Sequence, residues 1–139
     1  MTESIARKRV LHIPAGAGRA YQMGGISSFF LADGAETDDS YSISEWWLEA
    51  GERGPGAHQH EANDDIFYVI EGVMTFLAGE EKFDAAKGAF LRVPAGVLHD
   101  FENNSAARAG VLNISFPGGF EQDMPAIVDW FKVNRPVAG

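Results

Sequence analysis

The sequence predicts an all-β fold, an antiparallel barrel or double-sheet jelly roll, with one short helix at the C-terminal end. Two observations support this prediction. Short runs of β-branched and aromatic residues follow one another along most of the chain, and glycine-containing turns separate them. Helical spacing appears in a single stretch, residues 121–133, where four apolar residues recur at intervals of one turn: Met124, Ile127, Val128 and Phe131.

The length indicates one domain, residues 1–139, in which residues 1–18 form an N-terminal arm. A chain of this size buries about two thirds of its unfolded surface and holds a core without covalent staples. It contains no cysteine, so disulfides are excluded and any metal must bind to nitrogen and oxygen ligands. That composition suits a reducing cytoplasm, which is the expected location.

The charge and hydropathy patterns exclude two classes of partner. A formal net charge of −9 opposes binding to a phosphate backbone, and the short basic cluster of residues 7–9 does not reverse it. No apolar run approaches the roughly 20 residues of a membrane-spanning helix. We therefore expect no nucleic-acid and no membrane partner.

The first half of the chain contains two predicted strands and a loop. Residues 26–32 form a continuous apolar run that ends at the turn residues Asp33 and Gly34. Residues 41–49 have aromatic side chains on both faces, and we interpret their two tryptophans as packing residues. Three glycines and a proline in residues 51–56 indicate an irregular loop.

A strand at residues 66–70 starts the central meander, with Asp65 at its entrance. Side chains alternate sides along a strand, so Asp65, Phe67 and Val69 share one face. If Asp65 points inward, Phe67 and Val69 form walls of the same pocket. Further short strands are expected at residues 73–78, 82–85 and 88–93.

The last predicted strands carry the remaining polar candidates. A turn at residues 94–96 places His99 and Phe101 on one face, which makes Phe101 another candidate for the pocket wall. Residues 109–116 form an apolar strand that is interrupted by Asn113 and Ser115.

His58 and His60 are two residues apart in an extended segment, so their side chains point to the same face. Their β-carbons then lie about 6.6 Å apart at a rise of about 3.3 Å per residue. That separation allows both imidazoles to reach one metal ion at about 2.1 Å. The pair is therefore a candidate metal site.

Two blocks of residues have a regular spacing. In the first, four residues separate His60 from Asp65 and six separate Asp65 from Gly72. In the second, Gly88 is followed after five residues by Pro94-Ala95-Gly96, and His99 and Asn103 follow at intervals of two and three residues. Fifteen residues separate the two blocks.

These blocks resemble the paired motifs of the cupin superfamily, in which the first supplies two histidines and a carboxylate and the second a third histidine. The resemblance implies a cupin barrel with four metal ligands: His58, His60, Asp65 and His99. The first block departs from the family pattern twice. Aspartate replaces the usual glutamate, so neighbouring Asp64 competes with Asp65 for the role, and the glycine expected at position 52 is displaced to Gly51.

The implied cofactor is one divalent transition metal. Three imidazoles and one carboxylate suit Fe, Mn, Ni, Co, Cu and Zn, so the ligand set leaves the metal open. The implied partners are a small-molecule substrate, dioxygen if the chemistry is oxidative, and a second subunit, because arms such as residues 1–18 often cross between the subunits of cupin dimers.

The flanking segments resemble small single-domain cupins similar to quercetin 2,3-dioxygenase. These segments are residues 18–21, 67–72 and 117–121. The resemblance implies a metal-dependent dioxygenase acting on an enol, phenol or flavonol-like molecule, with Asp65 accepting the substrate proton. Two alternatives stay open: a non-oxidative metalloenzyme, such as an isomerase, cyclase or lyase, and a non-catalytic small-molecule-binding cupin.

Overall fold

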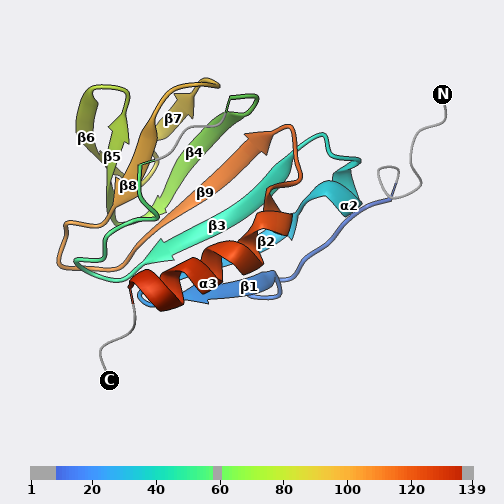
Figure 1. Cartoon of the computed structure of the whole chain (residues 1–139), viewed down its shortest axis with the longest axis horizontal. Coiled ribbons are helices and arrows are strands. Elements are labelled where there is room, and N and C mark those ends of the chain that lie inside the picture. The colour runs from blue at the N-terminus through green and yellow to red at the C-terminus, as the bar shows by residue number, and fades with distance from the viewer. Residues whose placement is uncertain (1–8, 58–60, 136–139) are drawn as a thin grey trace.

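The computed structural model describes residues 9–57 and 61–135, which fold into two antiparallel sheets and a C-terminal helix (Figure 1). One sheet has six strands in the order β1-β2-β3-β9-β4-β7, and the other has three in the order β6-β5-β8. The predicted antiparallel all-β fold with a short C-terminal helix is confirmed. Its form is the double-sheet jelly roll, because the strands are divided between two separate sheets.

The strands of the six-stranded sheet are β1 (Arg19–Met23), β2 (Ile26–Ala32), β3 (Ser42–Leu48), β4 (Asp64–Glu71), β7 (Phe90–Val93) and β9 (Ala109–Phe116). Those of the three-stranded sheet are β5 (Val73–Ala78), β6 (Glu81–Ala86) and β8 (His99–Glu102). The helical elements are α2 (Gly34–Thr37), η1 (Phe120–Asp123) and α3 (Met124–Asn134).

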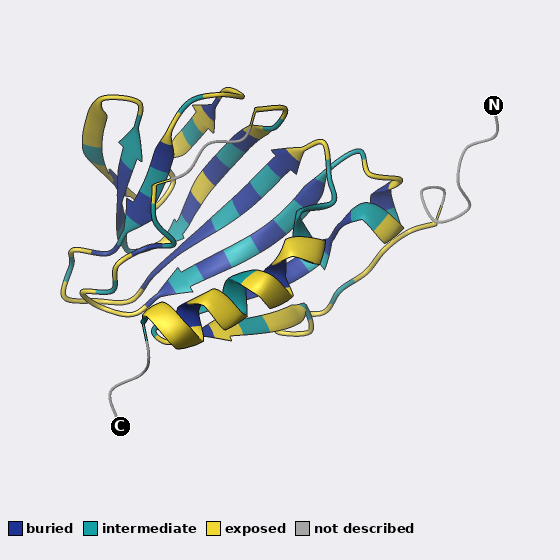
Figure 2. Ribbon diagram, in the orientation of Figure 1, coloured by how far each residue is buried: buried dark blue, intermediate teal, exposed yellow. Residues whose placement is uncertain are grey.

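Alternation along the strands sets which side chains enter the space between the sheets. Every second residue of β2 and β3 is buried, and the residues between them are half-buried (Figure 2). The turn from β4 to β5 depends on Gly72, whose φ is +70°. A β-carbon at this position would lie 2.6 Å from the carbonyl oxygen of Arg108, so both the backbone conformation and the space favour glycine.

Aromatic side chains join the two sheets in the core. The ring of Phe67 on β4 lies 5.3 Å from that of Phe76 on β5 and 5.7 Å from that of Phe101 on β8, measured between centroids. All three side chains are buried. Rings in such tilted contact add to the free energy gained by burying their apolar surface. This cluster fixes the separation of the sheets beside the candidate site.

The C-terminal segment differs in detail from the helix predicted at residues 121–133. A 3-10 turn occupies residues 120–123, and α3 begins at Met124, with Pro125 in its first turn. Phe131 and Met124 are its buried residues, while the opposite side of the helix is exposed (Figure 2). The helix packs against β1 and so covers one end of the space between the sheets (Figure 1).

Two elements were not expected from the sequence. Strand β1 pairs with β2 although its residues alternate weakly in hydropathy. Helix α2 stands where we expected a simple turn, and the Glu36 carboxylate accepts a hydrogen bond from the backbone nitrogen of Asp33 at 3.2 Å.

Over residues 9–57 and 61–135, no helix has the length and apolar character needed to cross a membrane.

Candidate metal centre and substrate cavity

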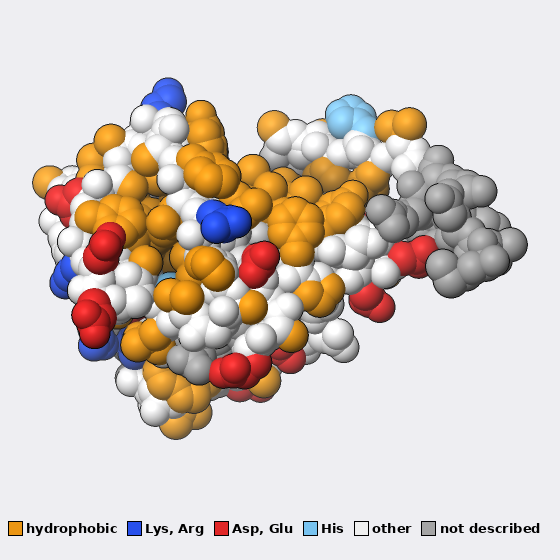
Figure 3. All heavy atoms as spheres, turned by 90° about the horizontal axis from the view of Figure 1, so that it is seen from above, with side chains coloured by type: hydrophobic (Ala, Val, Ile, Leu, Met, Phe, Trp, Pro, Cys, Tyr) orange, Lys and Arg blue, Asp and Glu red, His pale blue; other side chains and the backbone are white. Residues whose placement is uncertain are grey.

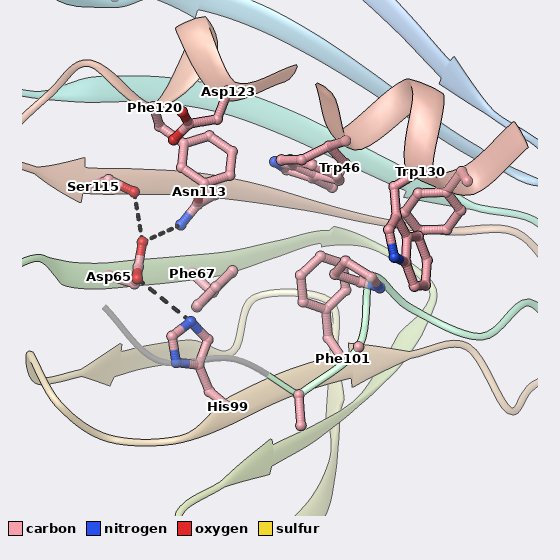
Figure 4. Close-up of a pocket in the computed structure, with 15 residues that line it drawn as sticks. Trp46, Asp65, Phe67, His99, Phe101, Asn113, Ser115, Phe120, Asp123 and Trp130 are labelled. Carbon is pink, nitrogen blue, oxygen red and sulfur yellow. Dashed lines mark hydrogen bonds and ion pairs between the residues drawn. The ribbon is translucent and has the colours of Figure 1, made fainter. Parts of the chain in front are cut away.

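The two sheets bring Asp65 and His99 together. Asp65 lies on β4 of the six-stranded sheet, and His99 is the first residue of β8 in the three-stranded sheet. Nε2 of His99 lies 3.4 Å from Oδ2 of Asp65, and each residue is 3% exposed (Figure 4). A carboxylate and an imidazole in this position can share a proton or bind one cation between them.

Two side chains of β9 orient the Asp65 carboxylate. The Ser115 hydroxyl donates to Oδ1 at 2.5 Å, and the Asn113 amide nitrogen lies 3.4 Å from the same oxygen (Figure 4). Ser115 lies opposite Asp65 in the register between β4 and β9. Both donors contact Oδ1, so the carboxylate presents Oδ2 towards His99. The sequence signal for this pair was two polar residues at alternate positions of an apolar strand, but it did not indicate their partner.

The backbone determines which nitrogen of His99 faces Asp65. Nδ1 lies 2.9 Å from the carbonyl oxygen of Val97, which can only accept a hydrogen bond. In the neutral ring the proton therefore sits on Nδ1, and Nε2 presents its lone pair to the Asp65 side. Burial by itself lowers the pKa of His99, but the hydrogen bonds to Asp65 and to Val97 outweigh it, and the pKa is raised.

A cavity of about 420 Å³ opens beside this pair. Its lining combines the polar cluster with aromatic side chains from both sheets and from the C-terminal segment. The lining residues are Trp46, Pro55, Gly56, Ala57, Asp65, Phe67, His99, Phe101, Asn113, Ser115, Phe120, Asp123, Ile127, Trp130 and Phe131. No lysine or arginine occurs among these described lining residues.

The predicted wall residues do not all reach this cavity. Phe67 and Phe101 line it, whereas Val69 shares the face of Phe67 but lies in the core, 1% exposed, and is absent from the lining. Side-chain alternation places Val69 correctly on the inner face. Its distance along the strand from Asp65 takes it past the end of the cavity.

The two competing aspartates lie on opposite sides of β4. Asp65 faces the cavity, whereas Asp64 is exposed and its Oδ1 accepts a hydrogen bond from the backbone nitrogen of Ala95 at 2.9 Å. The predicted ligands His58 and His60 lie outside the described residues. Ala57, which precedes them, lines the cavity.

Sequence reasoning missed most of the aromatic end of the cavity. Trp46, interpreted as a packing residue, is buried and lines the cavity, with its ring in edge contact with Phe101 at 6.1 Å. Trp130 and Phe131 reach the same space from α3 (Figure 4). A tryptophan on a strand has the same local pattern whether it faces a cavity or a core, so no signal in the sequence separates the two.

The described residues supply part of a metal site. No group of three or more metal-binding side chains occurs in residues 9–57 and 61–135. Asp65 and His99 nevertheless supply one oxygen and one nitrogen ligand from different sheets, and the neutral tautomer of His99 has the metal-binding nitrogen on the Asp65 side. These two donors fit a divalent transition metal.

Comparison with known proteins supports the fold and the family. A family model described as cupin domain matches residues 44–115. Quercetin 2,3-dioxygenase of Bacillus subtilis is 36% identical over 66 residues, which cover 46% of this chain and 19% of that enzyme. The chain spans 19% to 59% of the lengths of the curated relatives that it matches.

Solved structures share the fold at low sequence identity. A protein of Thermotoga maritima described as a predicted oxalate decarboxylase superposes with a TM-score of 0.67 at 16% identity, covering 78% of this chain and 99% of that one. Oxalate decarboxylase of Bacillus subtilis, which has Mn(II) centres, superposes with a TM-score of 0.66 at 17% identity, covering 76% of this chain and 29% of that one. The family model extends over the strands that carry Asp65, His99 and Ser115, and the chain therefore belongs to the cupin domain family.

Proposed function

We propose that this chain is a metal-dependent dioxygenase that acts on a neutral enol, phenol or flavonol-like molecule. One observation carries the proposal: a single cavity has the buried carboxylate and imidazole of Asp65 and His99 at one end and a wall of aromatic side chains at the other. The partial identity with quercetin 2,3-dioxygenase supports the oxidative assignment. His58, His60, Asp65 and His99 would hold one divalent transition metal.

The cavity lining indicates the charge and shape of the substrate. No lysine or arginine occurs among the described lining residues, and the chain has a net charge of −9. The bound metal would then be the main positive charge beside the substrate, so negative charges on the substrate that do not contact the metal would be desolvated with little compensation. Trp46, Phe101 and Trp130 offer ring faces and edges that suit a flat aromatic molecule. A volume of about 420 Å³ is in the range of small-molecule sites.

In the proposed mechanism the polar cluster handles the substrate proton. Asp65 accepts the proton of the enol or phenol hydroxyl, and Ser115 and Asn113 hold the carboxylate in place for this transfer. The aromatic wall orients the ring and excludes water. A bound divalent metal supplies Lewis acidity and, when redox-active, a route for electrons. The substrate is the reductant and takes up both atoms of dioxygen, so no further co-reactant is needed.

Oxygen consumption tests this function directly. Protein loaded in turn with Fe, Mn, Ni, Co or Cu is given flavonols, catechols and diketones, and oxalate and a sugar phosphate serve as anionic controls. We expect oxygen uptake with at least one neutral substrate and none with the anions. Absence of uptake across all neutral substrates and metals would remove the dioxygenase assignment, and uptake with the anions alone would overturn the substrate class.

One observation favours a second candidate function. A buried carboxylate and imidazole that are 3.4 Å apart can pass a proton between two substrate positions without any oxidant. A non-oxidative isomerase or lyase of this kind would act on the same neutral substrates. It would keep its activity without oxygen and with redox-inert zinc, which separates it from the dioxygenase.

A further inference from the structure

The cavity contains a second carboxylate, that of Asp123, which the proposed mechanism does not use. Asp123 is the last residue of η1 and lines the cavity together with Phe120 from the same turn (Figure 4). The two residues are three apart, and side chains at this interval share a face of a 3-10 helix. The other described lining residues of the C-terminal segment are apolar: Ile127, Trp130 and Phe131. Asp123 is therefore a charged residue on an otherwise apolar face.

The side chain of Asp123 does not stabilise the start of α3 in the usual way. Asp123 directly precedes this helix, at a position where aspartate commonly accepts a hydrogen bond from the first backbone N–H groups. Its backbone is helical and not extended, with φ −85° and ψ −13°, and its side chain makes no capping hydrogen bond. Capping therefore does not explain an aspartate at this position, whereas contact with a ligand in the cavity would.

The turn that carries Asp123 is fixed to the six-stranded sheet. The ring of Phe120 stacks on that of Phe30 in β2, with the centroids 6.1 Å apart and the planes at 12°. The Glu121 carboxylate, which is absent from the lining of this cavity, accepts a hydrogen bond from Nε of Arg19 at 2.8 Å. Neighbouring contacts thus hold the turn in place before any ligand binds. A group positioned in advance loses less conformational entropy when it contacts a ligand.

The charges around the cavity favour a ligand that donates hydrogen bonds. The described lining holds two carboxylates, those of Asp65 and Asp123, and no lysine or arginine. Seen from above, basic side chains are scattered over the molecule and form no continuous patch, so this face has no positive field that would attract anions (Figure 3). An ionised carboxylate only accepts hydrogen bonds. The group of the ligand that contacts Asp123 must therefore be a donor.

We propose that Asp123 determines substrate specificity by accepting a hydrogen bond from a second hydroxyl group of the substrate, other than the one that Asp65 deprotonates. The preferred substrate is then a polyhydroxylated aromatic molecule. This inference rests on the proposed function, because it takes the substrate to be an enol or phenol held beside Asp65. The two carboxylates belong to different elements, β4 and η1, so they can contact different groups of one ligand. A site built to bind a hydroxyl strongly rejects the analogue that lacks it.

Ligand binding without turnover tests this inference. Purified protein is titrated in the absence of oxygen, by tryptophan fluorescence, with quercetin and with analogues in which one hydroxyl at a time is methylated. We expect one methylation away from the reacting hydroxyl to weaken binding at least about tenfold in the natural chain and to have little effect in Asp123→Ala.

The matched control is Asp129→Ala, which removes an exposed carboxylate of α3 that is absent from the cavity lining. It should respond to each methylation as the natural chain does. Equal responses of the natural chain and Asp123→Ala to every methylation would overturn the inference, and so would a natural chain that binds none of these flavonols.

A second measurement detects the charge of Asp123 at the ligand through a gain of binding. The analogue carries a sulfate ester at the hydroxyl identified in the first titration. Asp123→Asn keeps the shape of the side chain and removes its charge, so we expect affinity for this anion to rise about threefold or more, with no rise in Asp129→Asn. Unchanged affinity in Asp123→Asn would contradict contact between Asp123 and the ligand.

The results separate this inference from the proposed function. Oxygen uptake together with equal responses to methylation would keep the dioxygenase and remove the role of Asp123. Binding that depends on Asp123 without any oxygen uptake would keep the recognition of the second hydroxyl and remove the dioxygenase.

Discussion

The two ends of the cavity are built in different ways. At the polar end, Asp65, His99 and Ser115 all come from strands, and each has a backbone or side-chain partner that sets its orientation. At the aromatic end, part of the wall comes from α3, through Trp130 and Phe131. The ends share one volume, but the first depends on strand register and the second on how the C-terminal segment is held.

A separate ionic network holds that segment. The Asp33 carboxylate accepts hydrogen bonds from the backbone nitrogens of Gly119 and Glu121 at 2.7 and 2.9 Å. The Glu121 carboxylate accepts from Nε of Arg19 at 2.8 Å and from the hydroxyl of Tyr21 at 2.7 Å. Different contacts therefore support the two ends of the cavity. We expect substitutions at the polar end to change the chemistry and substitutions at the aromatic end to change the substrate fit, each independently of the other.

The largest effect is expected at the polar end from Asp65→Asn. This change removes the charge of the proposed metal ligand and leaves the shape of the side chain, so we expect the affinity for Co(II) or Mn(II) to fall by at least about 100-fold. Titration calorimetry measures it. Asp64→Asn is the matched control and should bind metal as the natural chain does. Loss of metal affinity in Asp64→Asn, with unchanged affinity in Asp65→Asn, would show that the ligand is Asp64.

A smaller effect at the same end is expected from Ser115→Ala. Without the hydroxyl the Asp65 carboxylate loses the 2.5 Å hydrogen bond from Ser115, and we expect metal affinity to fall about tenfold. Ser42→Ala, a buried serine directly opposite Ser115 in the register of β3 and β9, is the control. Equal metal affinity in Ser115→Ala and the control would show that Ser115 does not position the ligand.

At the aromatic end, Trp130→Ala should weaken substrate binding and leave metal binding unchanged. Loss of one ring face from the wall is expected to raise the dissociation constant of a flavonol about tenfold, or about 1.4 kcal/mol. Fluorescence titration of the metal-loaded protein measures it, with Val133→Ala on the same helix as the control. A matching loss of metal affinity in Trp130→Ala would contradict the independence of the two ends.

The smallest effect concerns how the aromatic wall is held as pH falls. Hydrogen bonds from Arg19, then from Tyr21, lower the pKa of Glu121. A lowered pKa in the folded state stabilises the protein above the unfolded value of about 4.5, and this contribution is lost as pH falls through the folded value.

Glu121→Gln should therefore be less stable than the natural chain by about 1 kcal/mol at pH 7. The difference should shrink as pH falls below about 4.5. Thermal unfolding at pH 7 and pH 3.5 measures both values. A difference that stays constant over this range would show that the charge of Glu121 does not hold the segment.

Local patterns in the sequence predicted much of the fold and part of the candidate site. Alternation and glycine turns predicted the strand-rich fold, since side-chain period and positive φ are properties of short segments. They also placed Asp65, Phe67 and Phe101 on inner faces. The spacing of histidines and acid residues suggested the ligand set, and its members His58 and His60 stay a prediction.

The tertiary structure alone decided which residues meet at the site. Ser115 reaches Asp65 because β9 pairs with β4 across fifty residues of sequence, and Trp130 enters because α3 covers one end of the sheets. The tertiary structure also showed that Asp65 faces the cavity while Asp64 does not, and that Val69 is absent from the cavity lining. Pairing between distant strands depends on the summed packing of whole sheets, and no short stretch of sequence contains that information.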